Sequence, residues 1–200
     1  MDFSHVDTNN EMIKKIIKSS YEVFALNDYK KASTNMIVKK AGVSRGILYH
    51  YFKDKEELFD FLNFYSIERS IYDINKKLKW DDDDVIRRIC DITKYKLEIV
   101  KEYPYMIDFS EKYSHQMFKF VDKKYLEQWR EKIYNHGIDY SKFKDESSLG
   151  EVLHIVRWTY KGLGIELLKN QDSPSDESSI LRLMDECDKY YKILVSNFYR

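Results

Sequence analysis

The sequence predicts an all-α protein with a small N-terminal head of three helices and a larger helical body. Helix breakers are rare, because the 200 residues include only six glycines and two prolines. Apolar residues recur at steps of three and four through most of the chain, as they do on amphipathic helices. The segment 34–58 reads as a helix, a tight turn, a short helix and the start of a third. Together these patterns predict about nine helices.

The turn in this segment is the tetrapeptide Ala41-Gly42-Val43-Ser44. Gly42 can take the positive φ that ends a helix, and the Ser44 side chain can cap the helix that follows. Apolar residues on both sides have helical spacing and form a small core, namely Ile37, Ala41, Ile47, Leu48 and Phe52. The pattern predicts a helix-turn-helix, with an amphipathic helix over residues 9–26 packed across it.

A basic strip coincides with this unit. The whole chain is neutral, with 34 Lys plus Arg and 34 Asp plus Glu, but residues 29–53 hold six cations and no acidic residue. A polyanion is the natural partner of such a strip, although a lysine run by itself is more often a solvated face.

The predicted geometry favours DNA as that polyanion, because the second helix of a helix-turn-helix enters the major groove by its N-terminal end. Residues 44–47, which are Ser44, Arg45, Gly46 and Ile47, would face base edges there. Arg45 is suited to a bidentate contact with guanine. Tyr49 and Tyr51 offer hydroxyls to phosphates, and Lys55 begins the next helix, whose N-terminus also attracts anions. Thr34 and His50 of the same segment complete the candidate DNA-binding residues.

Residues 34–58 resemble the TetR/AcrR transcriptional regulators. The family pattern around the turn is Ala-Gly-Val-Ser-x-Gly-x-Leu-Tyr-x-Tyr-Phe-x-x-Lys-Glu-x-Leu, and residues 41–58 read AGVSRGILYHYFKDKEEL. The chain departs from it at Val38, where Ala is usual, and at Asn27-Asp28, where Gly commonly ends the first helix.

The resemblance implies a TetR-like fold with a DNA-binding domain over residues 1–53 and an effector-binding and dimerisation domain over residues 54–200. It also implies a ligand-responsive homodimer, most often a repressor, that leaves a palindromic operator when a small apolar or aromatic effector binds.

Further helices are expected from 54 to about 78, from the acidic cluster at 81–84 to about 103, after Pro104, from about 117 to 133, and over two long final segments. The acidic cluster is read as a helix N-terminus rather than as a metal site, because acidic residues are favoured by the helix dipole there.

The body is rich in aromatic residues, and these are the weakest indication of function because aromatics at helical spacing are usually core. Those on the central helices, where related proteins hold an inducer, form the candidate effector site with one from the penultimate helix: Tyr95, Tyr103, Met106, Phe109, Tyr113, Met117, Phe118, Trp129 and Trp158.

The last two helices carry more apolar surface than one core needs. The penultimate helix is apolar on two faces, so it must be covered twice. The resemblance favours a four-helix dimer interface over a fully internal hairpin. The candidate interface residues are Val152, Val156, Tyr160, Leu163, Met184, Tyr191, Leu194 and Phe198.

Other classes of function lack a signal. The chain has no Gly-rich phosphate loop, nucleophile elbow or metal-spaced histidine pair, so we expect no enzyme, cofactor or metal. The two cysteines have no ligand spacing, and no apolar run is long enough to span a membrane, so a cytoplasmic location is expected. The alternatives are an architectural DNA-binding protein of the same fold without an effector and, less favoured, a protein-interaction module.

Overall fold

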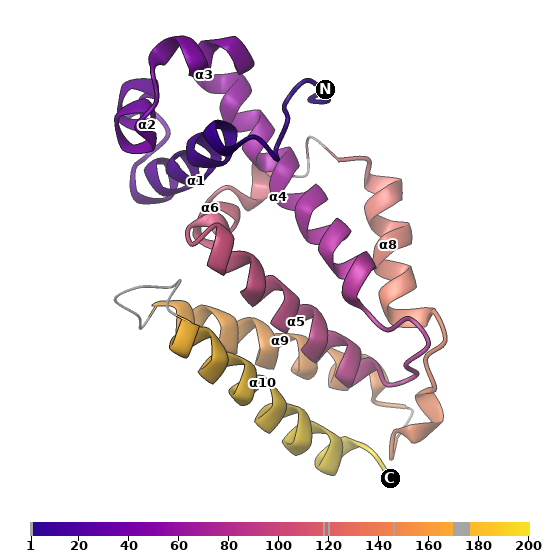
Figure 1. Cartoon of the computed structure of the whole chain (residues 1–200). Helices are drawn as coiled ribbons and strands as arrows, with labels where there is room; N and C mark the ends of the chain where they lie inside the picture. Colours follow the sequence, from indigo (N-terminus) through magenta and orange to yellow (C-terminus); the bar gives the residue numbers. More distant parts are fainter. Residues whose placement is uncertain (1, 118, 120, 146, 170–176) are drawn as a thin grey trace. The chain divides into compact units, whose positions relative to one another are not determined.

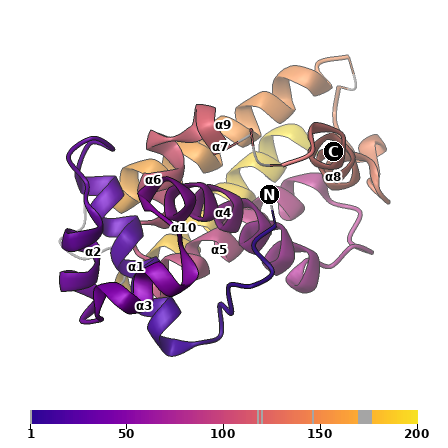
Figure 2. The same cartoon turned by 90° about the horizontal axis from the view of Figure 1, so that it is seen from above.

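The computed structural model describes residues 2–117, 119, 121–145, 147–169 and 177–200, and these are almost entirely helical (Figures 1 and 2). The helices are α1 (Glu11–Leu26), α2 (Thr34–Ala41), α3 (Arg45–Tyr51), α4 (Lys55–Lys77), α5 (Val85–Glu102), α6 (Met106–Lys112), α7 (Ser114–Met117), α8 (Lys123–Asn135), α9 (Leu149–Lys169) and α10 (Glu177–Phe198), with one short 3₁₀ helix at Tyr140–Lys142. The predicted all-α fold with an N-terminal helix-turn-helix is confirmed.

The predicted helix from about 117 to 133 is wrong at its start. The chain leaves α7 at Met117, passes through a turn in which the Lys119 amide donates to Gln116, and begins α8 only at Lys123. The apolar spacing suggested one helix because Val121 is buried, but that residue is buried from a non-helical segment.

The helices form two compact units, which we call the head unit and the body unit. The head unit comprises Met1–Ser70 and Glu102–Lys123, and the body unit comprises Ile71–Lys101 and Lys124–Arg200. The head unit thus contains the helix-turn-helix together with the first part of α4 and all of α6 and α7.

Aromatic side chains fill the core of the head unit. The ring of Phe59 on α4 lies 5.2 Å from that of Phe24 on α1 and 4.8 Å from that of Tyr113, centroid to centroid. Tyr21 is fully buried, and its hydroxyl pairs with Ser66 at 2.9 Å. Such edge-to-face pairs add to the free energy of burial, so α1, α4 and α6 are held as one body.

The end of α1 is tied to α6 by hydrogen bonds as well. Lys112 Nζ donates to three carbonyl oxygens at that end, those of Phe24, Ala25 and Asn27, at 2.8–3.1 Å. The Tyr113 hydroxyl also donates to the Phe24 carbonyl at 3.2 Å. The last carbonyls of a helix have no partner within it, and here α6 supplies the donors.

The body unit has two apolar clusters. The larger one joins α5, α9 and α10, which lie side by side in Figures 1 and 2, and includes Val85, Ile89, Val156 and Leu183. The smaller one, which we call the α8 cluster, consists of Ile74, Leu78, Ile92 and Ile133, with Trp80, Tyr95, Trp129 and Tyr134 packed against it.

The acidic cluster at 81–84 caps α5, as predicted. Asp84 accepts a hydrogen bond from the Arg87 amide at 2.9 Å. The same carboxylate accepts from the hydroxyls of Tyr191 and Tyr199, each at 2.7 Å. The cap therefore also fixes the end of α10 to the start of α5.

A buried arginine organises the loop before α5. Arg88 is 1 % exposed, and its guanidinium donates to four backbone carbonyls, those of Trp80, Asp82, Ile133 and His136, at 2.5–3.3 Å. The loop and the end of α8 are thus bound to one side chain. In the described residues, no helix is long and apolar enough to cross a membrane, and no group of three or more metal-binding side chains occurs.

Candidate nucleic-acid interface

The turn between α2 and α3 is closed by local hydrogen bonds. Gly42 has φ 66° and ψ 32°, and its amide donates to the Val38 carbonyl, as does the Val43 amide at 3.1 Å. Ser44 then caps α3, its side-chain oxygen accepting from the Ile47 amide at 3.3 Å. Both ends of the turn are therefore set by the residue types expected for them.

The positive φ makes Gly42 sensitive to substitution. We expect Gly42→Ala to lower the free energy of unfolding by about 1–2 kcal/mol, because an L side chain in left-handed geometry brings its Cβ against the following carbonyl oxygen. Gly46→Ala is the matched control, since an added Cβ there meets only Ser44 Oγ at 3.8 Å and alanine favours a helix. Urea unfolding measures both, and equal losses would contradict this account of the turn.

The inner side of the helix-turn-helix is well packed, which orients its outer side. Ile37, Leu48 and Phe52 are fully buried. Arg45, Gly46 and His50 are consequently exposed, together with Tyr49, whose exposed fraction is 41 %. α3 thus presents the residues predicted to face DNA on a rigid support.

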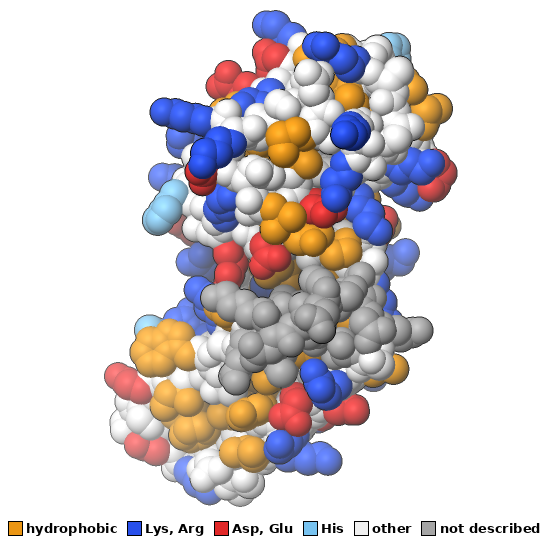
Figure 3. Space-filling model, turned by 90° about the vertical axis from the view of Figure 1, so that its left-hand side faces the viewer, with side chains coloured by type: hydrophobic (Ala, Val, Ile, Leu, Met, Phe, Trp, Pro, Cys, Tyr) orange, Lys and Arg blue, Asp and Glu red, His pale blue; other side chains and the backbone are white. Residues whose placement is uncertain are grey.

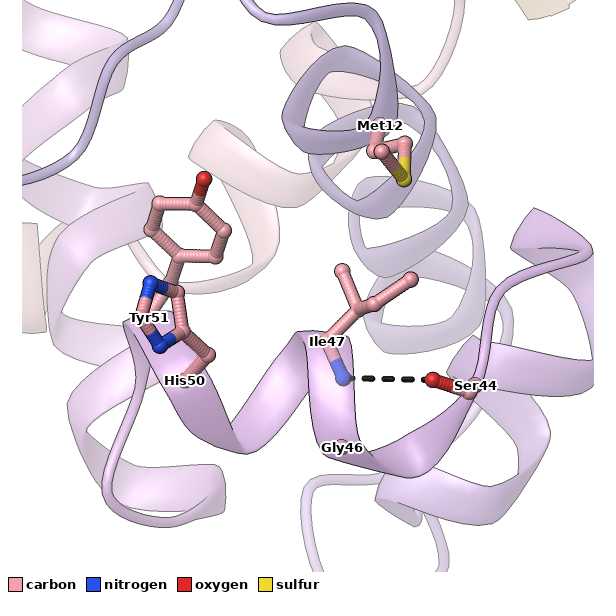
Figure 4. Close-up of a pocket in the computed structure, with 6 residues that line it drawn as sticks. All are labelled: Met12, Ser44, Gly46, Ile47, His50 and Tyr51. Carbon is pink, nitrogen blue, oxygen red and sulfur yellow. Dashed lines mark hydrogen bonds between the residues drawn. The ribbon is translucent and has the colours of Figure 1, made fainter.

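A shallow open depression of about 290 Å³ lies on this surface (Figure 4). It is lined by Met12 of α1 and by Ser44, Gly46, Ile47, His50 and Tyr51. In Figure 4 the side chains of Ile47 and Met12 point toward one another. Met12 is 47 % exposed and extends the α3 surface.

Tyr49 connects α3 with the start of α2. Its hydroxyl lies 3.1 Å from Thr34 Oγ1, and the Arg45 guanidinium carbon lies 5.7 Å from its ring centroid. Hydrogen bonds with Thr34 and then Arg45 lower the pKa of Tyr49. A more acidic hydroxyl is a better hydrogen-bond donor, which suits a contact with a phosphate oxygen.

Cations surround this surface, and Figure 3 shows Lys and Arg side chains gathered over its upper part, which is the head unit. Lys30, Lys39 and Lys53 are exposed. Lys40 pairs with Glu22 at 2.6 Å and Lys31 with Asp28 at 3.7 Å, so acidic neighbours partly offset those two charges.

Lys55 does not have the setting expected of a phosphate contact. Its ammonium donates to the carbonyls of Tyr29 at 2.8 Å and Ala32 at 3.0 Å, and it lies 4.2 Å from the Tyr29 ring centroid. These contacts hold the loop between α1 and α2 against the first turn of α4. The structure therefore favours a positioning role for Lys55, and the sequence carried no signal for it because the partners lie 23 and 26 residues away.

Residues 16–61 match the family model of the bacterial regulatory proteins of the TetR family. The matched segment contains α2, the turn and α3, whose geometry is that of a helix-turn-helix. Residues 16–61 therefore carry the DNA-binding domain of TetR-family transcriptional regulators.

Solved transcriptional regulators share this fold along nearly the whole chain. A regulator from Chloroflexus aurantiacus J-10-FL is 17 % identical with a TM-score of 0.61, and the match covers 99 % of this chain and 97 % of that one. The ketosteroid transcriptional regulator KstR2 of Mycobacterium tuberculosis is 16 % identical with a TM-score of 0.65 and 97 % of both chains covered. FadR from Bacillus subtilis, solved with stearoyl-CoA, is 18 % identical with a TM-score of 0.52, covering 91 % and 97 %. No curated protein matches the chain.

The candidate effector residues do not form one group. Tyr103, Met106, Phe109 and Tyr113 are buried in the aromatic core of the head unit, where they pack against α1 and α4, so their aromatic character serves packing. Trp158 is instead 66 % exposed on α9. Tyr95 and Trp129 pack against the α8 cluster, while Phe118 and the side chain of Met117 lie outside the described residues.

The candidate dimer residues lie on the inner faces of α9 and α10. Val152, Val156, Tyr160, Leu163 and Leu194 are buried in the larger cluster of the body unit, and Met184, Tyr191 and Phe198 pack against it. Of these side chains, Met184, Tyr191 and Phe198 are half-buried, while the other five have little exposed surface. Apolar residues on the exposed side of these helices include Ile155, Trp158, Leu181 and Ile193.

Proposed function

We propose that this regulator is a homodimeric repressor that reads a palindromic operator with α3 and releases it when an effector binds the body. The observation that carries the proposal is the outward face of α3, which is exposed, basic and fixed by two caps and a buried core. We retain residues 1–53 as the DNA-binding domain and 54–200 as the effector-binding and dimerisation domain. Operator DNA as the partner implies a cytoplasmic location.

The contacts with DNA divide into two sets. We assign base contacts to Ser44, Arg45, Gly46 and Ile47 at the N-terminal end of α3, with Arg45 bidentate to guanine. We assign contacts with the DNA phosphate backbone to the polar groups of Thr34, Tyr49, His50 and Tyr51. Lys55 supports this surface by holding the loop before α2, as its two carbonyl contacts indicate.

Dimerisation is assigned to the exposed apolar side of α9 and α10. Trp158 is 66 % exposed and Leu181 is 53 % exposed, and Figure 3 shows hydrophobic surface on the lower part of that face, over the body unit. An exposed apolar patch typically marks an interaction surface. A two-fold axis would place two heads on half-sites about 34 Å apart, or one turn of DNA.

This assignment predicts the effect of a charge at Trp158. Trp158→Asp should convert the dimer to a monomer in sedimentation equilibrium, with unchanged helicity because the side chain is not part of the core. Tyr72→Asp is the matched control, since Tyr72 is 60 % exposed on α4 of the same unit. A Trp158→Asp protein that stays dimeric would move the interface elsewhere.

Release follows from linkage between two binding events. In one arrangement of the dimer the two α3 helices match the spacing of the half-sites, and in the other they do not. An effector that binds the second arrangement more tightly lowers operator affinity by the difference between its binding free energies for the two arrangements, about 1–3 kcal/mol or roughly 5- to 150-fold. We propose an apolar effector; FadR from Bacillus subtilis, which has a similar fold, was solved in complex with stearoyl-CoA.

The alternative is an architectural protein that binds DNA without an effector. Fluorescence anisotropy of labelled operator DNA in the presence of candidate effectors separates the two. A ligand that weakens operator binding supports the switch, whereas ligands that bind the protein without changing operator affinity favour the architectural function.

A further inference from the structure

The depression on the α3 surface has apolar walls from two different helices. Met12 comes from the first turn of α1 and Ile47 from α3, and their side chains point toward one another (Figure 4). Met12 is 47 % exposed and Ile47 is half-buried, so both keep apolar surface that the core of the head unit does not cover. Neither side chain has a strong hydrogen-bonding group.

Both walls are fixed at the N-terminus of a helix. The Met12 amide donates to Asn10 Oδ1 at 2.9 Å, and the Ile47 amide donates to Ser44 Oγ at 3.3 Å. Gly46 also lines the depression but has no side chain to fill it, and an added Cβ would meet only Ser44 Oγ, at 3.8 Å. Because a side-chain cap holds each helix start, the space between the two walls is preformed.

The size of the depression suits a group that projects from a large partner. Its volume of about 290 Å³ is at the lower limit of small-molecule pockets, which hold about 300–1,000 Å³, and it is open rather than closed around its contents. A small effector bound there would keep much of its surface in water. A group attached to a macromolecule would be held in place by contacts elsewhere.

The charges and the position of the depression indicate DNA as that macromolecule. Residues 29–53 hold six cations and no acidic side chain. Glu11 precedes Met12, but its carboxylate pairs with Lys14 at 2.8 Å, which offsets its charge. Three of the lining residues, Ser44, Gly46 and Ile47, belong to the end of α3 that contacts base edges in a helix-turn-helix.

Thymine is the base whose edge matches two apolar walls. In the major groove it presents a methyl group, which cytosine, adenine and guanine lack. Cytosine presents an amino group at the corresponding place. This donor would lose its water against Met12 and Ile47 without gaining an acceptor, and that loss costs free energy.

We propose that Met12 and Ile47 read a thymine in each half-site of the operator by enclosing its methyl group. The proposal deepens the operator recognition proposed above and rests on it. It adds a residue of α1 to the base contacts assigned to α3, and it names the base that the apolar side chains select.

Uracil in place of thymine tests this assignment, because the two bases differ only by the methyl group. Thymines of the selected operator are replaced by deoxyuridine one position at a time, and binding to the full-length protein is measured by fluorescence anisotropy. We expect one position in each half-site at which uracil lowers affinity by about 4-fold, the change that corresponds to burial of one methyl group. With cytosine at that position, 5-methylcytosine should recover part of the affinity.

Variants of the two walls connect this effect with the depression. Met12→Ala and Ile47→Ala should each remove most of the preference for thymine over uracil, whereas Met12→Leu should keep it because leucine also forms an apolar wall. Met36→Ala is the matched control, since Met36 is 39 % exposed on α2 and does not line the depression. Its preference for thymine should equal that of the wild type. Far-UV circular dichroism checks that the helix content of each variant is unchanged.

The outcomes separate this assignment from the proposed function. A palindromic operator at which thymine and uracil bind equally well at every position overturns the assignment and leaves recognition by α3 in place. A thymine preference that persists in both Met12→Ala and Ile47→Ala overturns it too, because other residues then contact the methyl group. Selection that yields no motif contradicts the proposed function, and the assignment fails with it.

Discussion

Replacing Arg45 by alanine should lower affinity for the preferred operator by about 1–3 kcal/mol and remove the base preference at one position of each half-site. Arg45 is exposed at the start of α3, and the caps at Gly42 and Ser44 fix its direction. Its guanidinium can donate twice to one guanine, which no neighbouring side chain can replace. Competition binding with operators altered at each position measures the effect.

Lys39→Ala provides the control for this prediction. Lys39 is exposed on α2 and belongs to the same basic surface, but it lies outside the N-terminal end of α3. Its loss should weaken all sequences alike and reduce the salt dependence of binding, as expected for a phosphate contact. If Arg45→Ala and Lys39→Ala change specificity equally, Arg45 is not the residue that reads the base.

The largest loss of stability is expected from Arg88→Met, at about 3 kcal/mol or more. The substitution leaves one buried and three half-buried backbone carbonyl contacts without their donor, and each buried unsatisfied group costs about 1–3 kcal/mol unless water replaces the donor. Arg88→Lys should recover little, because one ammonium cannot match the planar guanidinium. The free energy of unfolding in urea is the measurement.

Arg87→Met, at the neighbouring residue, is the control for the loss of stability in Arg88→Met. Arg87 is partly exposed, pairs with Asp188 at 2.9 Å and lies 3.4 Å from the Tyr191 ring centroid. Removing it should cost about 1 kcal/mol, the usual scale of a partly exposed ion pair with a cation–π contact. A loss in Arg88→Met no larger than that in Arg87→Met would show that the loop before α5 does not depend on Arg88.

The head could be predicted because its signals are local. The Gly42 amide donates to the Val38 carbonyl and the Ser44 side chain accepts from the Ile47 amide, so partners four and three residues away are enough to predict the turn. Lys55 marks the limit of prediction from local signals, because its partners on the loop before α2 depend on how α4 packs. The same residue type at the start of a helix suits a phosphate contact or a tertiary contact equally well.

The helices of the body unit were predicted, but the side of each helix that is buried was not. The sequence of α9 shows two apolar faces, and periodicity alone does not say which of them meets the chain's own core. The structure buries Val156 in the chain's own core and exposes Trp158.

Selection of bound sequences from a random pool of double-stranded DNA, at near-physiological salt, tests the central claim most directly. The account predicts a palindromic motif whose half-sites are centred about one helical turn apart, or a multiple of it, with guanine at a fixed position in each. Arg45→Ala should lose that guanine and keep the symmetry. Recovery of DNA without any motif, or of a motif without two-fold symmetry, would contradict a dimer that reads its operator with α3.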